Sequence, residues 1–420
     1  MQFWENHPSK RIIGEVSREL QGKKIVLGVT SSVAAYKSIE LARELMRYGA
    51  EVTVVMSEEA TRLISPSLFE WATGNPVFHT RFSGETGHIL LADTHDAMVV
   101  APATASTLAK ISQGIVDTTV SLTAHTFIGA NKPVIVVPVM HKALYDAMTK
   151  TECIYRLERL GVIVHKPLIR GDKVRFPEPH ELAWHIETIL TRGKDFAGSR
   201  VLVTAGPTRE YIDAVRFVSN PSSGKMGVSL ALEALFRGAH VSLVHGPIVA
   251  PHSIDRSFEV ETTEEMLCAV LKEVEEFKPN IVILAAAPTD FKPSRWFEGK
   301  LRSEDTPITL ELVATPKVAE KVRESVADKA MLVLFVAEPV ASDSELVELA
   351  LKKKSKYKAD VVVANNIARK DIGFSSDHNE VLVIYGEDNR VVKIGKTLKR
   401  IVARRVLDVI GGMLGKQGVR

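Results

Sequence analysis

One pattern occurs twice in this chain and constrains its fold more than any other feature. Residues 24–30 read KIVLGVT, an apolar run that ends in a glycine-containing turn, and a helical stretch and GAEVTVVMS at 49–57 follow. Residues 200–206 read RVLVTAG, and a helix predicted from about 227 to 236 and GAHVSLVHG at 238–246 follow. Strand, turn, helix, glycine stop and strand form the βαβ unit of a doubly wound sheet. Because one sheet rarely restarts its opening unit, we predict an α/β fold with two doubly wound Rossmann-like domains.

Further apolar runs complete the two predicted sheets. Strands are predicted at 97–101 and 134–139 in the first half, and at 281–286, 331–336 and 361–364 in the second. A helix over 179–191 closes the first half. We therefore place the boundary near residue 195 and expect four parts: an N-terminal extension at 1–22 that is helix-like over 8–20, a first domain at 23–192, a linker at 193–199 and a second domain at 200–420.

Composition excludes several classes of protein. The chain has 54 Lys and Arg residues against 51 Asp and Glu residues, a net charge of only +3, so we expect no nucleic-acid partner. Its apolar runs are too short for a signal peptide or a membrane span, so we expect no membrane partner. Two cysteines, Cys153 and Cys268, are too few for a disulfide framework or a four-thiolate zinc site. A reducing cytoplasm is the expected location.

The first strand-to-helix turn favours an anionic ligand. Residues 28–35 read GVTSSVAA, which lacks the G-x-G-x-x-G pattern of dinucleotide-binding folds. Backbone N–H groups at the start of the helix attract a phosphate, and the hydroxyls of Thr30, Ser31 and Ser32 can add donors. Serine is also a common helix N-cap, so capping remains the alternative interpretation.

Three later turns place small polar residues at other strand ends. Ser57 follows the strand within 49–57, APATASTLAK at 101–110 follows the next, and PVMHKALYD at 138–146 follows another. Ligands of open α/β sheets bind outside the carboxyl ends of the strands, so these turns predict one pocket. Its further candidate hydrogen-bond donors to the ligand are Thr104, Ser106 and Thr107.

Together these segments resemble the flavin-containing cysteine decarboxylases, specifically the phosphopantothenoylcysteine decarboxylase group. The resemblance rests on the serine-rich turn, GHI-x-L-x-D at 87–93, APATA at 101–105 and P-x-M at 138–140. It implies a bound FMN, held by the hydroxyl residues above, and a catalytic histidine at His88. Outside this framework, a lone histidine beside an apolar stretch is more often structural.

Two positions depart from the family pattern. Bacterial members carry an asparagine after P-x-M and a cysteine in a flap, where this chain has His141 and Arg170. The resemblance implies that Met140, His141 and Arg170 contact the substrate. What replaces the missing cysteine and asparagine stays open. The alternative function is therefore an active ligase half behind a front half that is only an FMN-binding or regulatory module.

The second half has its own phosphate-binding pattern. VSNPSSGKMG at 218–227 places Ser222, Ser223, Gly224 and Lys225 just before a predicted helix, which is what a polyphosphate requires. The string does not match the Walker A motif. Polar turns also follow the later strands, and Lys354 and Lys358, four residues apart in a lysine cluster, are expected to share one helix face. A solvated helix face is the ordinary interpretation of such a cluster.

This half resembles phosphopantothenate–cysteine ligase, and the whole chain resembles the bifunctional coenzyme A biosynthesis proteins. The strings SN-x-SSGKMG and GF-SSDHNEV (373–381) carry the resemblance. It implies that CTP, with magnesium, activates the carboxylate of 4′-phosphopantothenate as an acyl-cytidylate, which L-cysteine then attacks. Asn220 is expected to hold the acyl-cytidylate and Lys300 to assist catalysis. The further residues expected to contact CTP are Ala287, Asp290, Thr315, Pro316, Lys317, Val318, Phe335, Lys354 and Lys358.

Several points stay open on the sequence alone. The register of the lysine contacts, the magnesium ligands, the choice between CTP and ATP, and the role of the N-terminal extension are among them. The resemblance implies a homo-oligomer, with trimeric flavin halves and dimeric ligase halves. A retained His88 and a full ligase half argue against a purely regulatory protein, and the missing glycine fingerprint disfavours an NAD-dependent dehydrogenase.

Overall fold

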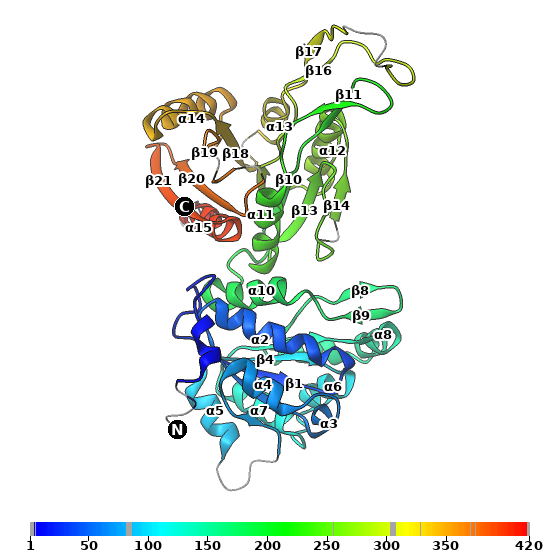
Figure 1. Ribbon diagram of the computed structural model, residues 1–420, viewed down its shortest axis with the longest axis vertical. Helices are drawn as coiled ribbons and strands as arrows, with labels where there is room; N and C mark the ends of the chain where they lie inside the picture. The colour runs from blue at the N-terminus through cyan, green and yellow to red at the C-terminus, as the bar shows by residue number, and fades with distance from the viewer. Residues whose placement is uncertain are drawn as a thin grey trace. The chain divides into compact units, whose positions relative to one another are not determined.

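The computed structural model describes residues 4, 6–80, 86–254, 256–302, 308–327, 329–369, 371–373 and 375–417, with side chains of the last helix described to residue 415. The chain divides into two compact units, Met1–Gly193 and Lys194–Arg420 (Figure 1). Phe374, which belongs to the GF-SSDHNEV string above, lies outside the described residues.

The first unit contains a parallel sheet of six strands in the order β3-β2-β1-β4-β5-β7. Its strands are β1 (Lys24–Val29), β2 (Glu51–Met56), β3 (Val77–Phe78), β4 (Ala97–Ala103), β5 (Val134–Pro138) and β7 (Ile163–Val164). Strand β1 pairs in parallel with both β2 and β4. The strand order therefore reverses between β1 and β4, and this switch point is where open α/β sheets leave a crevice for a ligand.

Helices cover both faces of this sheet. They are α2 (Lys37–Arg47), α3 (Glu58–Thr61), α4 (Pro66–Thr73), α5 (Gly87–Thr94), α6 (Ala105–Gln113), α7 (Thr119–Gly129), α8 (Lys142–Lys150), α9 (Cys153–Arg159) and α10 (Pro179–Arg192). Apolar residues of α5, α6, α7 and α9 pack on one face, while α2, α4 and α10 pack together on the other. Both faces of the strands are thereby buried, which explains why the strands read as continuous apolar runs rather than as alternating ones.

Two elements of the first unit differ from prediction. The helix expected from about residue 33 to 48 is divided into a short 3-10 helix, η2 (Val33–Tyr36), and α2. The helix-like segment at 8–20 forms only a 3-10 helix, η1 (Pro8–Ile12), followed by turns. Residues after η1 instead bond to the end of α2, where Gly14 N donates to Met46 O at 3.0 Å and Leu20 N donates to Tyr48 O at 2.9 Å. These backbone hydrogen bonds to a distant segment replace the hydrogen bonds of a local helix.

The second unit contains an eight-stranded sheet in the order β14-β13-β10-β15-β18-β19-β20-β21. Its strands are β10 (Arg200–Ala205), β13 (His240–His245), β14 (Arg256–Glu259), β15 (Ile281–Leu284), β18 (Met331–Glu338), β19 (Val361–Asn366), β20 (His378–Tyr385) and β21 (Arg390–Leu398). The sheet is parallel except for its last two strands, which pair antiparallel. Because β10 pairs with both β13 and β15, this sheet has its own switch point between β10 and β15. The predicted fold of two doubly wound Rossmann-like domains is thus confirmed.

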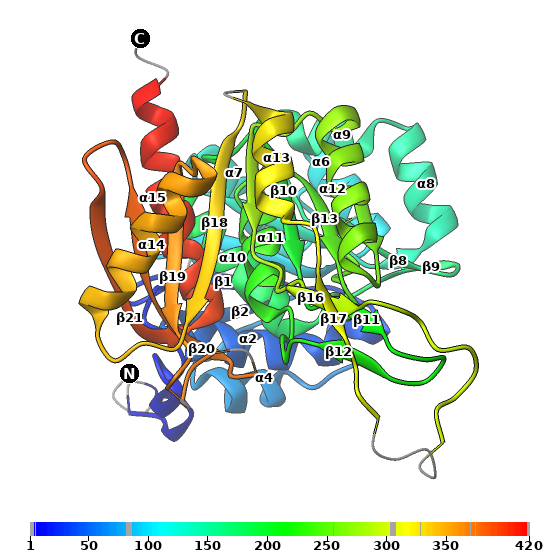
Figure 2. The same cartoon turned by 90° about the horizontal axis from the view of Figure 1, so that it is seen from above.

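Helices also cover both faces of the second sheet. They are α11 (Lys225–Phe236), α12 (Thr263–Glu276), α13 (Val318–Val326), α14 (Asp343–Tyr357) and α15 (Lys399–Gln417). Helices α11 and α15 pack together, and α12, α13 and α14 contribute to one apolar core on the other face. Two short hairpin-like pairs lie together away from the main sheet in Figures 1 and 2: β11 (Arg209–Tyr211) with β12 (Phe217–Ser219), and β16 (Phe291–Pro293) with β17 (Leu312–Ala314).

The predicted glycine stops occupy the positions expected of them. Gly49 and Gly238 follow the last residues of α2 and α11, with φ values of +106° and +90°. That left-handed region is open to glycine at little cost, so the chain can turn there from helix into strand. Cys153 and Cys268 are both free thiols. Among the described residues, no helix is long and apolar enough to span a membrane.

Candidate functional sites

The first candidate site lies at the β1/β4 switch point. The Thr30 hydroxyl, which is 1% exposed, donates to Pro102 O at 2.7 Å and accepts from Thr104 N at 3.2 Å. This hydroxyl therefore joins the turns that follow β1 and β4. Its proton is already used within the protein, so Thr30 positions the turns and its hydroxyl does not donate to a phosphate in this arrangement.

Other predicted hydroxyl residues cap the helices at this edge. Ser32 Oγ accepts from Ala34 N at the start of η2, and Ser57 Oγ accepts from Ala60 N at 3.2 Å at the start of α3. The Thr104 hydroxyl caps α6 and lies 3.1 Å from the Thr107 hydroxyl, while Ser31 and Ser106 are exposed. A capping hydroxyl accepts one bond and keeps its proton. Both earlier interpretations, capping and anion binding, are thus chemically compatible.

Hydroxyl donors and helix N-termini at one edge fit the phosphate of a flavin mononucleotide. His88, half-buried, is the second residue of α5. Because α5 leads into the amino end of β4, its first turn lies toward the opposite, carboxyl edge of the sheet. The topology therefore places His88 on the same side as the hydroxyl turns.

The residues at the positions of the family asparagine and cysteine, His141 and Arg170, both belong to a small separate sheet. Its strands, in the order β6-β9-β8, are β6 (Met140–His141), β9 (Lys173–Arg175) and β8 (Leu168–Arg170). Lys173 pairs with both His141 and Arg170, so these two residues lie on either side of it. His141 Nδ1 lies 3.7 Å from a carboxylate oxygen of Asp172. The sheet therefore brings His141 and Arg170, 29 residues apart in number, to one exposed place beside the β5 end.

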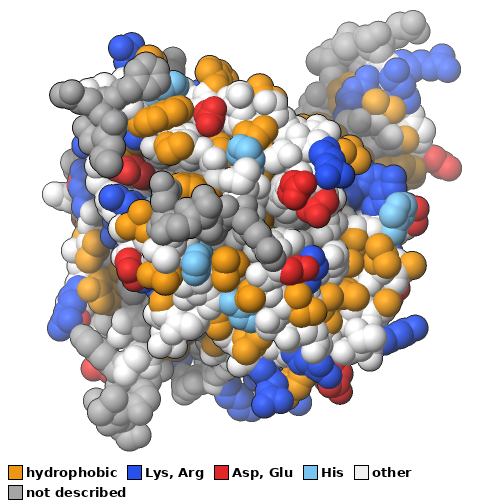
Figure 3. All heavy atoms as spheres, turned by 90° about the horizontal axis from the view of Figure 1, so that it is seen from below, with side chains coloured by type: hydrophobic (Ala, Val, Ile, Leu, Met, Phe, Trp, Pro, Cys, Tyr) orange, Lys and Arg blue, Asp and Glu red, His pale blue; other side chains and the backbone are white. Residues whose placement is uncertain are grey.

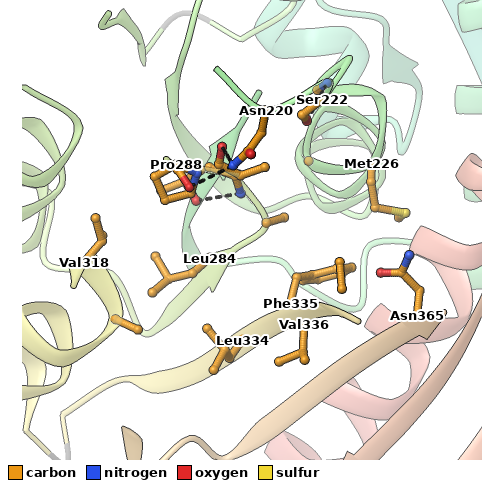
Figure 4. A pocket seen from close by; sticks show the side chains of 18 of the residues that line it. Asn220, Ser222, Met226, Leu284, Pro288, Val318, Leu334, Phe335, Val336 and Asn365 are labelled. Carbon is orange, nitrogen blue, oxygen red and sulfur yellow. Dashed lines mark hydrogen bonds between the residues drawn. The ribbon is translucent and has the colours of Figure 1, made fainter. Parts of the chain in front are cut away.

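The second candidate site is a pocket of about 410 Å³ at the β10/β15 switch point. Its walls come from the carboxyl ends of the central strands and from the start of α11, and Figure 4 shows the side chains that face it. Twelve of the predicted residues line it: Asn220, Ser222, Ser223, Gly224, Lys225, Ala287, Asp290, Thr315, Pro316, Lys317, Val318 and Phe335. Three predicted residues, Lys300, Lys354 and Lys358, do not.

Asn220 is fixed by two bonds to the turn after β15. Its Nδ2 donates to Ala287 O at 3.1 Å and to Pro288 O at 3.0 Å, as Figure 4 shows. Both amide hydrogens are thereby used, and the amide oxygen stays available as an acceptor.

The start of α11 approaches the sheet closely beside Asn220. A Cβ atom on Gly227, in the first turn of this helix, would lie 2.6 Å from Ala205 Cβ and 2.8 Å from Thr204 O. Only glycine allows that approach. The helix N-terminus, with its N–H groups, is consequently seated on the pocket floor.

Lysines around the pocket are held by carboxylates. Lys317 Nζ lies 2.5 Å from Asp290 Oδ1, Lys225 Nζ lies 2.6 Å from Asp377 Oδ1, and Lys353 Nζ lies 2.6 Å from Glu338 Oε1. The hydrogen bond from Lys225 lowers the pKa of Asp377. Each of these lysines therefore lies beside a carboxylate, an arrangement that suits a charged ligand that arrives with a cation.

The structure does not place the two predicted lysines, Lys354 and Lys358, at the pocket. Lys354 Nζ points away from the pocket and donates to Gly386 O and Asn389 Oδ1, both at 2.7 Å. Lys358 follows the end of α14, is exposed and has a left-handed φ of +48°, so it cannot continue the helix face. Lys353 and Tyr357 line the pocket instead. The signal was present, because Lys353 and Tyr357 continue the buried stripe of Leu346 and Ala350 at helical spacing.

Lys300 lies in an exposed loop outside the pocket, between β16 and β17. Asp213, which sequence reasoning missed, holds this loop: its carboxylate accepts from Leu301 N at 3.0 Å and from Val215 N and Arg216 N at 2.7 Å. Burial alone raises the pKa of this carboxyl, but the hydrogen bonds outweigh it and hold that pKa far below its usual range. An aspartate two residues after a short strand gave no sequence signal for this role.

Lys399 and Asn379 were also missed. Lys399, the first residue of α15, lines the pocket, and its Nζ donates to Gly373 O at 2.7 Å. Asn379 lines the same part of the pocket and is 4% exposed. Among the described residues, no group of three or more His, Cys, Asp or Glu side chains is placed to hold a metal ion.

Fold and sites together define a two-domain α/β enzyme, with one candidate site at the switch point of each sheet. Residues 13–187 match the family model described as Flavoprotein, and residues 196–413 match that of the DNA/pantothenate metabolism flavoprotein C-terminal domain.

Relatives match along nearly the whole chain. A coenzyme A biosynthesis bifunctional protein CoaBC of Thermococcus kodakarensis is 42% identical over 97% of this chain and 100% of its own. The proteins of that name from Methanocaldococcus jannaschii and Escherichia coli are 34% and 31% identical, over 95% and 93% of this chain and 96% and 97% of theirs. The chain therefore belongs to the family of bifunctional coenzyme A biosynthesis proteins. It is an enzyme with a cysteine ligase and a decarboxylase activity.

Proposed function

We propose that the second unit joins L-cysteine to 4′-phosphopantothenate at the expense of CTP, with magnesium as the accompanying cation. A carboxylate oxygen attacks the α-phosphorus of CTP and pyrophosphate leaves, which gives an acyl-cytidylate. The cysteine nitrogen then attacks the acyl carbon, loses a proton and displaces CMP. The observation that supports this proposal is the pocket at the β10/β15 switch point, which joins Asn220, the start of α11 and several lysines.

The pocket residues divide into two groups by their chemistry. Ser222, Ser223, Gly224 and Lys225 bind phosphate at the start of α11, where N–H groups and the helix dipole favour an anion. Asn220 holds the acyl-cytidylate through its amide oxygen and the turn it fixes. The nucleotide contacts are Ala287, Asp290, Thr315, Pro316, Lys317, Val318, Phe335 and Lys353.

Lys300 remains a proposed catalytic residue of the ligase. Its loop lies outside the pocket, so this role requires the loop, or the same loop of a second copy, to reach the ligand. Positive charge there stabilises the charge that accumulates on the leaving pyrophosphate.

We propose that the first unit decarboxylates 4′-phosphopantothenoylcysteine to 4′-phosphopantetheine with FMN. The flavin, when bound, supplies the electron sink that the departing carboxylate needs. Ser31, Ser32, Ser57, Thr104, Ser106 and Thr107 bind its phosphate. His88 moves the substrate proton, and Met140, His141 and Arg170 contact the substrate. His141 and Arg170, which lie on either side of Lys173 in the β6-β9-β8 sheet, provide N–H donors for a carboxylate.

We propose that the protein forms a homo-oligomer. Large apolar side chains of the first unit are 46–57% exposed: Leu63, Leu68, Trp71, Ile89 and Leu90. Figure 3 shows one face on which apolar side chains lie in several groups between charged and histidine side chains. Where such exposed apolar side chains form a contiguous patch, a partner subunit commonly covers it. Size-exclusion chromatography with light scattering tests this, and a monomer at micromolar concentration contradicts it.

Two single variants test the two reactions separately in the full chain. Asn220→Ala is expected to lower the ligase kcat about a hundredfold, measured as pyrophosphate release with CTP, and to leave decarboxylation of added 4′-phosphopantothenoylcysteine unchanged. His88→Asn is expected to lower carbon dioxide release at least about a hundredfold without changing ligation. His180→Asn, exposed on α10, is the matched control.

The outcomes distinguish the proposal from its alternative. Flavin absorbance at the first unit without any carbon dioxide release leaves an active ligase joined to a flavin-binding module, and it contradicts the decarboxylase proposal. Replacement of CTP by ATP at equal rate contradicts the CTP preference.

A further inference from the structure

Two helices begin at the same corner of the ligase pocket, and each places a lysine at its first residue. Helix α11 begins at Lys225 and α15 begins at Lys399, and both lysines line the pocket. A helix N-terminus carries partial positive charge, so a cation in its first turn is disfavoured. Two such arrangements at one corner favour a negative group there, and Asp377 provides one for Lys225.

Lys399 is enclosed rather than solvated. Its side chain is 5% exposed and its Nζ donates to Gly373 O at 2.7 Å. Burial first, and the charge of Lys225 second, lower the pKa of Lys399 to about 8, while Asp377 acts in the opposite direction. The Asp377 side chain is 70% exposed and pairs with Lys225. His378, next to it, is also exposed. Lys399 is therefore a buried cation that lies close to a second cation, Lys225.

Asn379 provides a second, independent observation at this corner. Its side chain is 4% exposed, and its Oδ1 accepts from Glu380 N at 3.0 Å. Within the described part of the chain, its amide nitrogen has no hydrogen-bond partner. Because Asn379 lines the pocket, this amide nitrogen is free to donate to a ligand there.

We propose that the Lys399 corner, formed by Lys225, Gly373, Asn379 and Lys399, binds a phosphoryl group of a substrate, with the Lys399 ammonium and the Asn379 amide as its donors. A phosphoryl group offers several acceptor oxygens and a negative charge, which both helix N-termini also favour. The proposal rests on the proposed ligase function. Two substrates bring such a group: the nucleotide, through its polyphosphate, and 4′-phosphopantothenate.

Calorimetric titration of the full chain tests the corner with four probes: CTP, pyrophosphate, 4′-phosphopantothenate and pantothenate, which lacks the phosphate. Lys399→Met is expected to weaken binding of the phosphate that occupies the corner by about tenfold to a hundredfold. Asn379→Ala is expected to weaken it by about fivefold to tenfold. Lys393→Met is the matched control, because Lys393 lies on β21, is half-exposed and pairs with Asp343.

A proton readout separates binding from a merely structural role. At pH 8.5 a large share of Lys399 is neutral in the free protein, so an arriving phosphate is expected to draw a proton onto it. Wild type and Lys393→Met should take up this proton, measured from the dependence of the binding enthalpy on the ionisation enthalpy of the buffer. Lys399→Met should take up less. Melting temperatures establish that each variant is folded.

Each pattern of results decides one point. If the variants bind only CTP and pyrophosphate more weakly, the corner binds the nucleotide. If they bind only 4′-phosphopantothenate more weakly, with the affinity for pantothenate unchanged, the corner binds that substrate. If Lys399→Met binds every probe with unchanged affinity and unchanged proton uptake, and ligation is intact, the proposed phosphoryl site is wrong while the proposed ligase function stands. A wild-type chain that binds none of the phosphate probes overturns both.

Discussion

Carboxylates hold the pocket lysines in place, but only weakly. In the Lys317–Asp290 and Lys225–Asp377 pairs every side chain is 42–70% exposed. Exposed ion pairs of this kind contribute about 0–1 kcal/mol, so a lysine can exchange its carboxylate for a phosphate at little cost. The carboxylates set freed by that exchange are then suitable partners for a cation that accompanies the nucleotide. Lys399 differs because it is enclosed.

The register of the α14 lysines can be tested with neighbouring residues. Lys353→Gln is expected to raise the KM for the nucleotide about tenfold, because it removes a cation that lines the pocket. Lys354→Gln serves as the matched control and should leave KM unchanged, since Lys354 bonds to Gly386 and Asn389 on the other side. Steady-state ligation at varied CTP provides the measurement. A larger effect from Lys354→Gln would restore the register first predicted.

At the scale of elements, the ligase unit depends on the contact between α11 and α15. Glu233 and Arg404 form an ion pair across this contact at 2.9 Å, and both side chains are 0% exposed. Arg237, at the end of α11, pairs with Asp195 and Asp408 and lies over the Phe196 ring. Helices α11 and α15 each begin at the Lys399 corner. Their packing therefore also positions the residues proposed to bind the phosphoryl group.

Breaking the buried pair is expected to destabilise the second unit. Glu233→Gln leaves the Arg404 guanidinium buried without its charged partner and should cost about 3–5 kcal/mol. The double variant Glu233→Leu/Arg404→Met removes both charges, so its cost should be smaller than that of either single variant. The free energies of unfolding of the single and double variants are measured by urea unfolding, monitored by circular dichroism, and are checked by calorimetry. Additive losses in the double variant would show that the pair is not coupled.

At the scale of the whole molecule, each unit has its own sheet, core and site. The separate cores predict separate unfolding transitions, and titratable groups inside one core affect that unit alone. The first unit contains such a group in His165, which is 7% exposed and whose Nδ1 lies 2.7 Å from that of His185.

Acid is therefore expected to destabilise the first unit. Burial lowers the pKa of His165 from 6.5 to about 4, and burial also lowers that of His95 to about 4. The unfolded chain binds these protons first, so stability falls as the pH drops from about 6.5 toward 4. For His165 the loss approaches about 3 kcal/mol. Differential scanning calorimetry at pH 7.5 and 5 should show a smaller pH effect in His165→Gln than in wild type. Equal pH dependence in the two proteins would contradict this assignment.

The sequence by itself determined the features that depend on local pattern. Both βαβ openings, the buried parallel strands and the glycine stops at Gly49 and Gly238 follow from hydrophobic runs and from the backbone freedom of glycine. Most of the ligase pocket also follows, because parallel strands bring their carboxyl-end turns to one edge whatever the details of packing. Of the twelve predicted residues that line that pocket, Ser222 to Lys225 follow from the local pattern, and the others were expected from the family resemblance.

Only the tertiary structure decided which side chains of those turns face inward. A shift of one residue on a helix rotates a side chain by about 100°, so the end of α14 selected Lys353 over Lys354. Lys399 and Asn379 reach the pocket from elements far along the chain, and Thr30 turns its proton to Pro102 rather than outward. Such choices depend on contacts between residues distant in sequence, which no local pattern records.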